Sequence, residues 1–459
     1  MDAARLQETI IAISTPAGPG GLGVVRLSGR DSLAVAKILF EPNKKDPTIP
    51  LRTAVLGHIL DRDNGRRLDE AFLFYFPGPR SYTREDVVEI SCHGSPAILE
   101  ETVRLGVKAG AIPALPGEFT LRAFLNGRID ILQAEAVQSL IQSTSLEQAR
   151  ISFSQVQGEL SQSISGLRTC LVDLMALIEA RIEFADDLES VPDSKLKEVL
   201  ETTLGQVQAL VDSYQIGRII TEGIRVVIAG RPNVGKSTLF NAILGKERAI
   251  VTPIAGTTRD FITETAQWRG QSFQLIDMAG LARPRDPIEE ESIRRGKTLA
   301  EEAAGILLLL DASQNAAEED LELAAKYCSK KMIIAFNKVD LPRKIDKEKV
   351  LARAPRASHL EISALKKTNI EHLKELIAQT FGSNEKTPEV VVLHLRQKLL
   401  LEEIGRNLSS AREQHRADTS EEIIAEDIRR ALALIGQLTG EISSDDVLEA
   451  VFSNFCIGK

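Results

Sequence analysis

Apolar residues follow two different periods along the chain. In the first ~120 residues, short apolar or alternating runs are separated by Gly and Pro, as is typical of strands and turns. These runs predict an N-terminal α/β domain over residues 1–120. They cover residues 9–13, 23–27, 71–76 and 87–91.

From about Leu132 the apolar period becomes helical. An apolar residue recurs at every third or fourth position from Val156 to Ile182, which predicts one long amphipathic helix. A second helical pattern starts at Ser420, a candidate N-cap. The first pattern consists of Val156, Leu160, Ile164, Leu167, Leu171, Leu174, Ile178 and Ile182, and the second of Ile424, Ile428, Leu432 and Ile435.

Between the two helical regions, strand-then-helix units run from Ile224 to Gly382. This order predicts a multidomain α/β plus all-α protein, in which a Ras-like P-loop domain is inserted into a helical domain built from two chain segments. We expect a helical first part at residues 121–222, the nucleotide domain at 223–382 and a helical second part at 383–459.

Composition narrows the function class. A chain of 459 residues with 43% apolar and 26% charged residues is typical of a globular protein with several domains. The longest apolar run, Ala303 to Leu310, is too short to span a membrane, so we expect a cytoplasmic protein. The net charge of −9 argues against bulk electrostatic coating of nucleic acid, and any RNA contact must be local. The cysteines and histidines are too dispersed to predict a zinc site or a disulfide framework.

The strongest motif is the segment Gly230-Arg231-Pro232-Asn233-Val234-Gly235-Lys236-Ser237, which fits the phosphate-loop pattern. It lies between a strand-like and a helix-like segment, as the pattern requires. In such loops, backbone N–H groups surround the phosphates, the lysine reaches the β- and γ-phosphates, and the serine hydroxyl binds Mg²⁺. The sequence therefore predicts a nucleotide site here.

Three further motifs follow in the order found in GTPases. Asp277-Met278-Ala279-Gly280 ends an apolar strand, where the acidic residue can hold the Mg²⁺ shell. Asn337-Lys338-Val339-Asp340 follows another strand. Asp340 can accept hydrogen bonds from guanine N1–H and the 2-amino group, which predicts GTP rather than ATP, because adenine would leave a buried Asp340 unpaired. Ser363-Ala364-Leu365 offers backbone amides to the guanine O6.

For the group that orients the attacking water, the residues leave two interpretations open. Leu281 stands where Ras-like GTPases carry glutamine, so another group must act. The acidic stretch at residues 289–291 is one candidate, and a solvated helix N-terminus is the alternative. An arginine finger from Arg259 or Arg283, or a bound cation beside Asn233, would neutralise the developing charge.

Taken together, several segments resemble the MnmE, or TrmE, family of tRNA-modifying GTPases along the whole chain. They include the phosphate loop, the switch segment at residues 252–260 and the C-terminal Phe455-Cys456-Ile457-Gly458-Lys459. Ser14-Thr15-Pro16, Pro116-Gly117-Glu118-Phe119-Thr120 and Arg122-Ala123-Phe124-Leu125-Asn126-Gly127 extend the resemblance into the N-terminal domain.

The resemblance implies a K⁺-dependent GTPase that forms a homodimer through N-terminal domains resembling tetrahydrofolate-binding domains. It also implies a heterotetramer with an FAD-containing partner of the MnmG, or GidA, type, which adds a carboxymethylaminomethyl-type group to the wobble uridine of certain tRNAs. The implied cofactors are GTP or GDP, Mg²⁺, K⁺ and 5-formyltetrahydrofolate or a related tetrahydrofolate.

The site residues implied by the resemblance fall into four groups. Glu289 would orient the water, and Cys456 would act as a nucleophile in the modification. Mg²⁺ would be held by Ser237 and Thr258, and K⁺ by Asn233, Thr252, Ile254 and Thr257. The folate would be bound by Arg26, Glu89, Arg128 and Lys459. The GTP site comprises Asn233, Val234, Gly235, Lys236, Ser237, Thr238, Thr252, Pro253, Ile254, Ala255, Gly256, Thr257, Thr258, Asp277, Met278, Ala279, Gly280, Asn337, Lys338, Asp340, Ser363, Ala364 and Leu365.

Two residues depart from the family pattern, and two segments match unrelated motifs by accident. Met278 stands where the family commonly has Thr, and Arg128 where Lys is frequent. Gly18 to Gly23 imitates a dinucleotide fingerprint but is followed by a strand-like segment, and Cys456 to Lys459 imitates a prenylation box. The competing hypothesis is a GTPase that acts as a binding switch, for instance in ribosome assembly, without modification chemistry.

Overall fold

The computed structural model describes residues 4–43, 49–183, 193–244, 262–269, 271–277, 303–382, 388, 390–417, 419–442, 445–453, 455 and 457–458. Its contacts form two compact units. The first consists of Met1–Gln138, Phe153–Gln208 and Leu399–Lys459, and the second of Ser139–Ser152 and Ala209–Lys398. The three-domain boundaries expected from the sequence stay a prediction.

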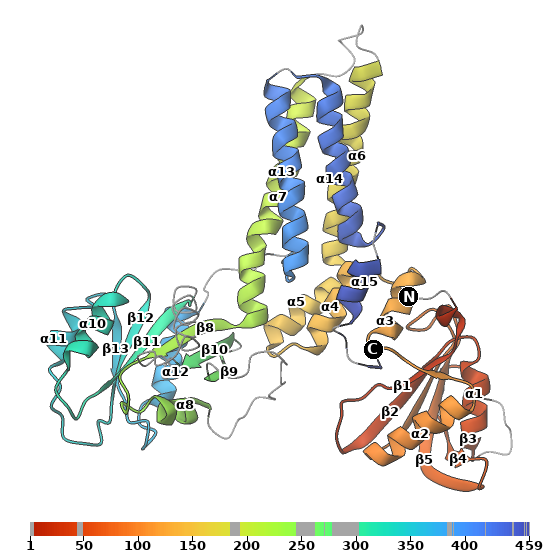
Figure 1. The fold of residues 1–459 in the computed structure, drawn as a ribbon, viewed down its shortest axis with the longest axis horizontal. Helices are drawn as coiled ribbons and strands as arrows, with labels where there is room; N and C mark the ends of the chain where they lie inside the picture. Colours follow the sequence, from red (N-terminus) through yellow and green to blue (C-terminus); the bar gives the residue numbers. More distant parts are fainter. Residues whose placement is uncertain are drawn as a thin grey trace, which may run out of the picture. The chain divides into compact units, whose positions relative to one another are not determined.

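In the first unit, a seven-stranded sheet has the order β3-β4-β5-β6-β2-β1-β7. Figure 1 labels its strands β1 to β5. Its pairs are antiparallel except for β1 with β7. The strands are β1 (Ile10–Ile13), β2 (Gly20–Ser28), β3 (Phe40–Pro42), β4 (Val55–Asp61), β5 (Arg66–Phe76), β6 (Val87–Gly94) and β7 (Ile112–Pro113), preceded by a short 3-10 helix, η1 (Arg5–Gln7).

Alternating burial along the strands creates the N-terminal core. In β5, Leu73 and Tyr75 are buried whereas Phe72 on the opposite face is exposed. The buried face packs against α1 (Ser32–Leu39) and α2 (Pro96–Lys108) through residues such as Leu39 and Leu105. The four strands expected in this domain are confirmed as β1, β2, β5 and β6, and β2, β5 and β6 extend beyond their predicted bounds. The strands β3, β4 and β7 were not predicted.

The chain end joins this N-terminal part. α3 (Glu118–Leu125), α4 (Ile131–Ile141) and α15 (Asp445–Phe452) share an apolar cluster that includes Leu121, Ile131 and Phe452. A Cβ added at Gly117 would lie 2.6 Å from the Phe452 carbonyl oxygen, so glycine permits this close approach. The last residues thus lie against the N-terminal domain.

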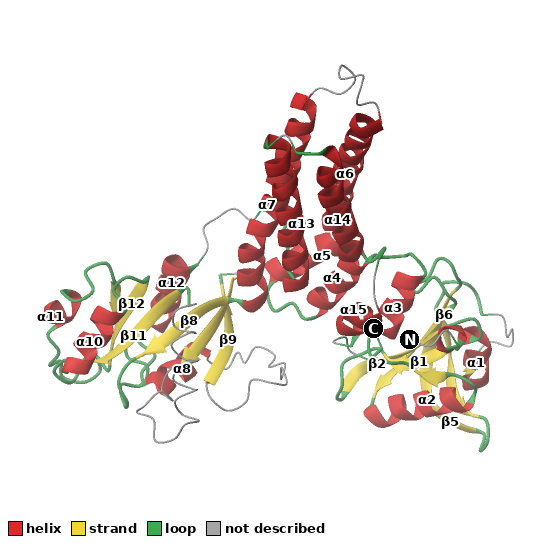
Figure 2. Ribbon diagram, turned by 45° about the horizontal axis from the view of Figure 1, so that its top comes forward, coloured by secondary structure: helices red, strands yellow, loops and turns green. Residues whose placement is uncertain are grey.

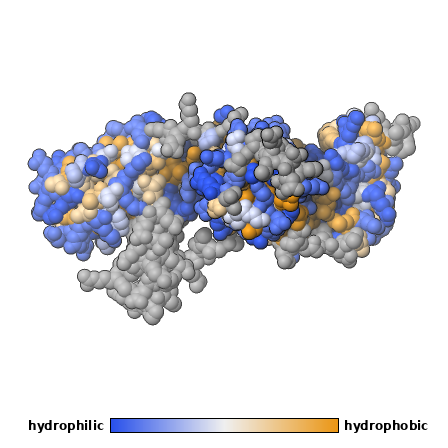
Figure 3. Space-filling view, turned by 90° about the horizontal axis from the view of Figure 1, so that it is seen from above, coloured by the Kyte–Doolittle hydropathy of each residue, from blue (hydrophilic) through white to orange (hydrophobic). Residues whose placement is uncertain are grey.

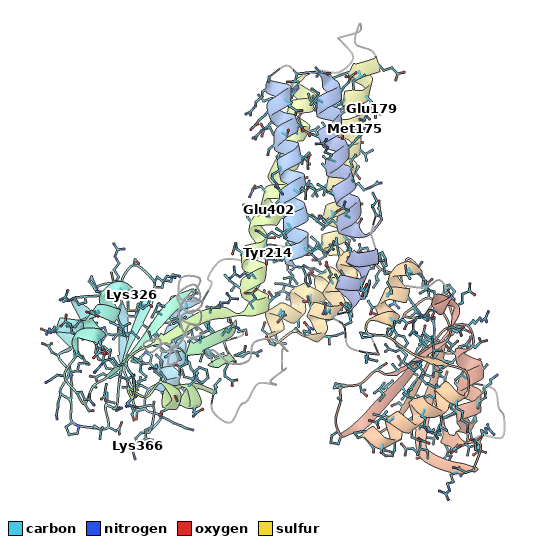
Figure 4. All side chains as sticks on the ribbon, viewed as in Figure 1. Met175, Glu179, Tyr214, Lys326, Lys366 and Glu402 are labelled. Carbon is cyan, nitrogen blue, oxygen red and sulfur yellow. The ribbon has the colours of Figure 1, made fainter. Side chains whose placement is uncertain are left out.

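The helical part contains α5 (Leu146–Val156), α6 (Glu159–Glu183), α7 (Asp193–Glu222), α13 (Leu395–Arg416) and α14 (Glu421–Thr439). The prediction of one helix from Val156 is wrong in its start. Gly158, with φ +96°, separates α5 from α6, and Val156 closes the earlier helix. Within α6, Met175 is buried and Glu179, one turn later, is exposed (Figure 4).

The second unit contains a six-stranded sheet of order β13-β12-β11-β8-β10-β9. Figure 2 shows its strands β8, β9, β11 and β12 side by side. All neighbours are parallel except β9 with β10. The strands are β8 (Ile224–Ala229), β9 (Ile262–Trp268), β10 (Gln271–Asp277), β11 (Gly305–Asp311), β12 (Met332–Asn337) and β13 (Ser358–Glu361).

Helices cover both faces of this sheet, as a mostly parallel sheet requires. α8 (Lys236–Leu244) and α12 (Ile370–Phe381) contribute Leu239 and Leu373 to one apolar cluster. α10 (Glu318–Lys326) and α11 (Lys347–Leu351) contribute Leu321 and Val350 to the other. This doubly wound arrangement agrees with the predicted Ras-like P-loop domain.

Polar side chains dominate the face drawn in Figure 3, with apolar patches between them. Within the ranges that the structure describes, no helix combines the length and the apolar character needed to cross a bilayer.

Candidate nucleotide site and N-terminal pocket

Five parallel strands end at the same edge of the second sheet. β8 leads directly into the phosphate loop, β10 ends at Asp277, β11 at Asp311 and β12 at Asn337, and β13 precedes Ser363. In open α/β sheets, ligands bind outside the carboxyl ends of the strands. The topology therefore brings four motifs from distant parts of the chain to one edge.

The phosphate loop depends on three residues with positive φ angles: Gly230, Asn233 and Gly235. A Cβ at Gly230 would lie 2.4 Å from the Leu309 carbonyl oxygen. A Cβ at Gly235 would lie 2.4 Å from Nδ2 of Asn337. Glycine is therefore required at both ends of the loop by backbone conformation and by close approach.

Lys236 is folded into this loop at the first position of α8. Its Nζ donates hydrogen bonds to the carbonyl oxygens of Gly230 (2.7 Å) and Arg231 (2.9 Å), and the side chain is buried. Burial lowers the pKa of Lys236, and the negative charge of Asp277 opposes this shift. An ammonium group held by backbone carbonyl oxygens can exchange them for phosphate oxygens when a nucleotide binds.

Oxygen groups lie beside the lysine. Ser237 and Asn233 are exposed, whereas Asp277 is 5% exposed at the end of β10. Hydroxyl, amide and carboxylate oxygens are the ligands that hard cations prefer. The donor types present therefore fit Mg²⁺ near Ser237 and Asp277.

The base-recognition motif is bonded to the phosphate loop. Nδ2 of Asn337 donates to the Val234 carbonyl oxygen (2.8 Å), and its Oδ1 accepts from the Ala364 amide (2.9 Å). Lys338 donates from Nζ to the Asn233 carbonyl oxygen (2.9 Å) and to Oδ2 of Asp311 (2.6 Å). The predicted motifs thus form one hydrogen-bonded network.

Asp340 is held by Ser363, whose Oγ donates to Oδ1 at 2.5 Å. Ser363 is buried, and its Oγ also accepts from the amide of Lys366 (3.1 Å). Asp340 itself is exposed, whereas the prediction of GTP over ATP reasons from a buried Asp340. The base would have to supply that burial when it binds. Leu365 is also exposed.

Several predicted residues lie outside the described residues. They are the switch segment at residues 252–258, the segment 278–280, Leu281, Glu289 and its neighbours, the finger candidates Arg259 and Arg283, Cys456 and Lys459. The structure brings together Asn233, Val234, Gly235, Lys236, Ser237, Thr238, Asp277, Asn337, Lys338, Asp340, Ser363, Ala364 and Leu365. Asp311 is a residue that the sequence analysis missed, although a single acidic residue ending the apolar run 305–310 was a usable signal.

The first unit contains a separate cavity of about 460 Å³. It combines aromatic rings with three guanidinium groups and one carboxylate, a composition suited to a planar anionic molecule. Its lining residues are Phe76, Pro79, Arg80, Ser81, Tyr82, Arg84, Val87, Glu89 and Arg128.

Contacts fix the charged groups of this cavity. Nε of Arg26 donates to Oε1 of Glu89 (2.8 Å), its register partner on the neighbouring strand. Nη1 of Arg128 donates to the Ser81 carbonyl oxygen (2.7 Å), and the guanidinium carbon lies 5.0 Å from the centre of the Tyr82 ring. Three of the four predicted folate residues therefore lie together. Arg80, Tyr82 and Arg84 were not predicted as site residues, because they belong to no motif.

The chain end reaches the same place. The Gly458 carbonyl oxygen accepts hydrogen bonds from Oγ of Ser14 (3.0 Å) and Nη1 of Arg26 (3.4 Å). A Cβ at Gly458 would lie 2.1 Å from the Ile13 carbonyl oxygen, and φ is +92°. Ile457 also forms a β-bridge with Pro116. A glycine is thus needed for the tail to dock beside Arg26.

Comparisons with known proteins agree over the whole chain. Residues 9–128 match the family model described as "GTP-binding protein TrmE N-terminus", and residues 131–456 match "MnmE helical domain". The G domain of the T. maritima FeoB iron transporter is 28% identical and covers 34% of this chain and 98% of that chain. The TM-score of this structural match is 0.28, so the match is not used for the family assignment.

The assignment to a family rests on relatives that match the chain over nearly its full length. The tRNA modification GTPase MnmE of Aquifex aeolicus is 41% identical over 99% of this chain and 100% of that protein. The protein of the same name from Natranaerobius thermophilus is 40% identical with the same coverage. With two family models and these relatives spanning the sequence, the chain belongs to the MnmE family of tRNA modification GTPases.

Proposed function

We propose that this protein binds GTP at the carboxyl edge of the second sheet and hydrolyses it to GDP and phosphate in the service of tRNA wobble-uridine modification. The observation that carries this proposal is the network joining Lys236, Asn337 and Lys338 around the phosphate loop. Lys236 would bind the β- and γ-phosphates, and Asp340, held by Ser363, would accept from the guanine edge.

Two cations complete the proposed site. Ser237 and Thr258 would hold Mg²⁺, which neutralises charge on the phosphates when bound. Asn233, Thr252, Ile254 and Thr257 would hold K⁺. Support from the described residues is the exposed amide side chain of Asn233 at the loop, held in place by the bond from Lys338 to its carbonyl oxygen.

Glu289 is the proposed water-orienting residue, because Leu281 has no hydrogen-bonding group. A carboxylate can accept a hydrogen bond from the attacking water and align it with the γ-phosphate. The alternative to K⁺ remains an arginine finger from Arg259 or Arg283. A K⁺ site predicts faster GTP hydrolysis in K⁺ than in Na⁺, whereas an arginine finger predicts equal rates in the two salts.

The test compares steady-state GTP hydrolysis in K⁺ and Na⁺ buffers of equal ionic strength, with Glu289→Ala alongside. We expect strong stimulation by K⁺ and its loss in the variant, while GDP affinity stays within about twofold of the native value. Equal rates in both salts would reject the K⁺ site and favour a side-chain finger. A native rate for Glu289→Ala would remove Glu289 from the mechanism.

For the N-terminal cavity we propose 5-formyltetrahydrofolate or a related tetrahydrofolate as the ligand. Glu89 can accept from the amino groups of a pterin ring, and arginines can pair with the glutamate carboxylates. Tyr82 and Phe76 offer aromatic surface for a flat ring. Lys459 would add a further cation from the chain end.

Calorimetric titration with 5-formyltetrahydrofolate tests this assignment. We expect Glu89→Gln and Arg128→Ala each to weaken binding by roughly tenfold or more, the cost of one charge-assisted hydrogen bond. Arg67→Ala, which removes an exposed partner of Glu41 in the same sheet, is the matched control. Native affinity in both cavity variants would place the ligand elsewhere.

The modification itself is proposed to need a homodimer, joined through the N-terminal domains, and an FAD-containing partner of the MnmG type. Cys456 would act as a thiolate nucleophile near the folate. Mass spectrometry of tRNA nucleosides formed by the two proteins together tests this, with Cys456→Ser alongside. Loss of the modified uridine with unchanged GTP hydrolysis supports modification chemistry. Full modification by Cys456→Ser would favour a purely GTP-dependent switching role for this chain.

A further inference from the structure

A buried carboxylate outside the predicted motifs contacts the phosphate loop. Asp320 is the third residue of α10 and is 1% exposed. Its Oδ1 accepts from Nε of Arg231 (2.9 Å), and its Oδ2 accepts from the Ala317 amide (3.0 Å). Both carboxylate oxygens are therefore engaged by fixed donors, as a buried charge requires.

Arg231 links this carboxylate to the catalytic lysine. Its side chain is held by Asp320, and its backbone carbonyl oxygen accepts a hydrogen bond from Nζ of Lys236 (2.9 Å). The preceding residue, Gly230, is confined by the Leu309 carbonyl oxygen of β11. The first turn of the loop is thus fixed by β11 on one side and by α10 on the other.

This pair differs from the exposed ion pairs of the same unit. Arg269 and Glu375 lie 3.4 Å apart with both side chains more than half exposed, where screening and side-chain entropy leave little net effect. Asp320 is withdrawn from water, so removal of Arg231 leaves a buried charge with one partner fewer. We therefore expect the Arg231–Asp320 pair to hold the first turn of the phosphate loop in a fixed position relative to the N-terminus of α10.

We propose that Asp320 is a positioning residue for GTP hydrolysis: it anchors Arg231 and thereby places the first turn of the phosphate loop so that Lys236 meets the phosphates. The inference rests on the proposed function, in which Lys236 is the phosphate ligand. It assigns the pair to phosphate recognition, because Asp340 and Ser363 follow other strands and none of the hydrogen bonds found among the described residues joins them to Arg231 or Asp320.

Comparison of GDP with GMP separates these two parts of recognition, since GMP lacks the β-phosphate. We expect Asp320→Asn to weaken GDP binding by roughly tenfold and GMP binding by less than about twofold. Asparagine keeps the size of the side chain but has no charge and one acceptor oxygen fewer. Arg231→Lys, which keeps the charge without the planar fork, should show the same selective loss to a smaller extent.

A double-mutant cycle adds a second readout. Arg231→Ala and Asp320→Ala combined should weaken GDP binding no more than the worse single variant, because both remove the same contact. Glu375→Ala is the control and should bind both nucleotides as the native protein does. Thermal unfolding without nucleotide identifies any variant that fails to fold, and Asp320→Asn and Arg231→Lys then carry the test.

The outcomes are distinct. Native GDP affinity in Asp320→Asn and Arg231→Lys overturns the inference, and so does an equal loss for GDP and GMP, which would mean that the pair only stabilises the domain. Lys236→Ala tests the underlying proposal separately. If that variant binds GDP normally, the phosphate site itself is wrong. If it loses GDP while the Asp320 variants do not, only the positioning role fails.

Discussion

Nζ of Lys338 lies 2.6 Å from Oδ2 of Asp311, at the ends of two neighbouring parallel strands. The side chain of Asp311 is almost fully buried, and its Oδ1 accepts from the amide (3.0 Å) and Oγ (2.6 Å) of Ser313. Lys338 carries this constraint to the phosphate loop through its bond to the Asn233 carbonyl oxygen. Asp311 therefore positions a lysine shared by the base and phosphate regions.

Replacement of Asp311 by Asn should weaken GDP binding by roughly tenfold, because hydrogen bonds between charged groups contribute more than neutral ones. Burial raises the pKa of Asp311, but the hydrogen bonds from Lys338 and Ser313 outweigh it, so the pKa lies below its usual value. The contribution of the carboxylate is then present above pH ~4 and is lost only as the pH falls through the lowered pKa.

Calorimetry at pH 7 and pH 5 should therefore give the same ratio of native to Asp311→Asn affinity. Lys374→Ala, which removes a surface partner of Glu371, serves as the control and should leave binding unchanged. A ratio that collapses at pH 5 would show that Asp311 is already protonated there. The positioning role would then need another explanation.

Gly235→Ala should abolish tight guanine-nucleotide binding while the fold persists. The added Cβ meets Nδ2 of Asn337 at 2.4 Å, and the φ of +102° is strained for any residue with a side chain. It would displace the amide that ties the base motif to the Val234 carbonyl oxygen. Fluorescence titration with a labelled GDP, together with circular dichroism, checks both parts of this expectation.

The matched control is Gly205→Ala in α7. This glycine is exposed and helical, and an added Cβ meets nothing within 4 Å. The substitution should stabilise the protein by about 0.5–1 kcal/mol through the unfolded chain and the helix preference of alanine. Urea unfolding measures it. Equal effects of the two alanines on GDP affinity would mean that the clash at Asn337 is unimportant.

The parts of the fold predicted correctly from sequence are those with strong local signals. β8, α8 and β12 fall where apolar runs flank the nucleotide motifs, and the stripe of α6 is buried at Leu160, Ile164 and Leu167 as its period requires. The start of that helix was misplaced because the apolar spacing continues across Gly158, whose left-handed backbone ends the preceding helix.

The residues of the candidate sites also fall into two groups, those in continuous sequence motifs and those that only the fold brings together. The phosphate loop and the base motif are each a continuous stretch of sequence, so their residues could be predicted directly. The cavity residues Arg80, Tyr82 and Arg84 lie between β5 and β6, and only the fold brings Arg128 to them and the chain end to Arg26. Asp320 was missed because its role depends on a helix N-terminus meeting a loop 89 positions earlier in sequence.

Replacement of Arg122 by Ala should destabilise the first unit by about 3–5 kcal/mol. Arg122 is 1% exposed and donates to Glu118 (3.0 Å), which is itself fully buried, and to Glu85 (3.2 Å). It also donates to the Glu8 carbonyl oxygen (2.8 Å). Among the described residues, Arg5 is then the cation that still pairs with Glu118.

Urea unfolding monitored by far-UV circular dichroism measures this loss in the free energy of unfolding. Arg104→Ala is the control, since Arg104 pairs with Glu101 on the exposed face of α2 and its removal should change stability little. If Arg122→Ala unfolds at the same urea concentration as Arg104→Ala, the buried network does not hold η1 and α3 together.

Cys92 and Cys328 should differ sharply in their reaction with iodoacetamide. Cys92 is 2% exposed in the core between β6 and α2, and burial, followed by the negative charge of Asp69, raises its pKa to about 11. Roughly one thiol in a thousand is then ionised at pH 8, whereas the thiolate is the reactive form. Cys328 is exposed after α10.

Peptide mass spectrometry of the folded protein at pH 8 should find Cys328 alkylated within minutes and Cys92 protected, and both alkylated in urea. Because the pKa of Cys92 is raised, its neutral thiol is favoured in the folded state and the stability from this group falls only as the pH rises above the ordinary thiol pKa. Rapid labelling of Cys92 in the folded protein would show that the N-terminal sheet opens locally, since a thiol sealed between sheet and helix cannot otherwise meet the reagent.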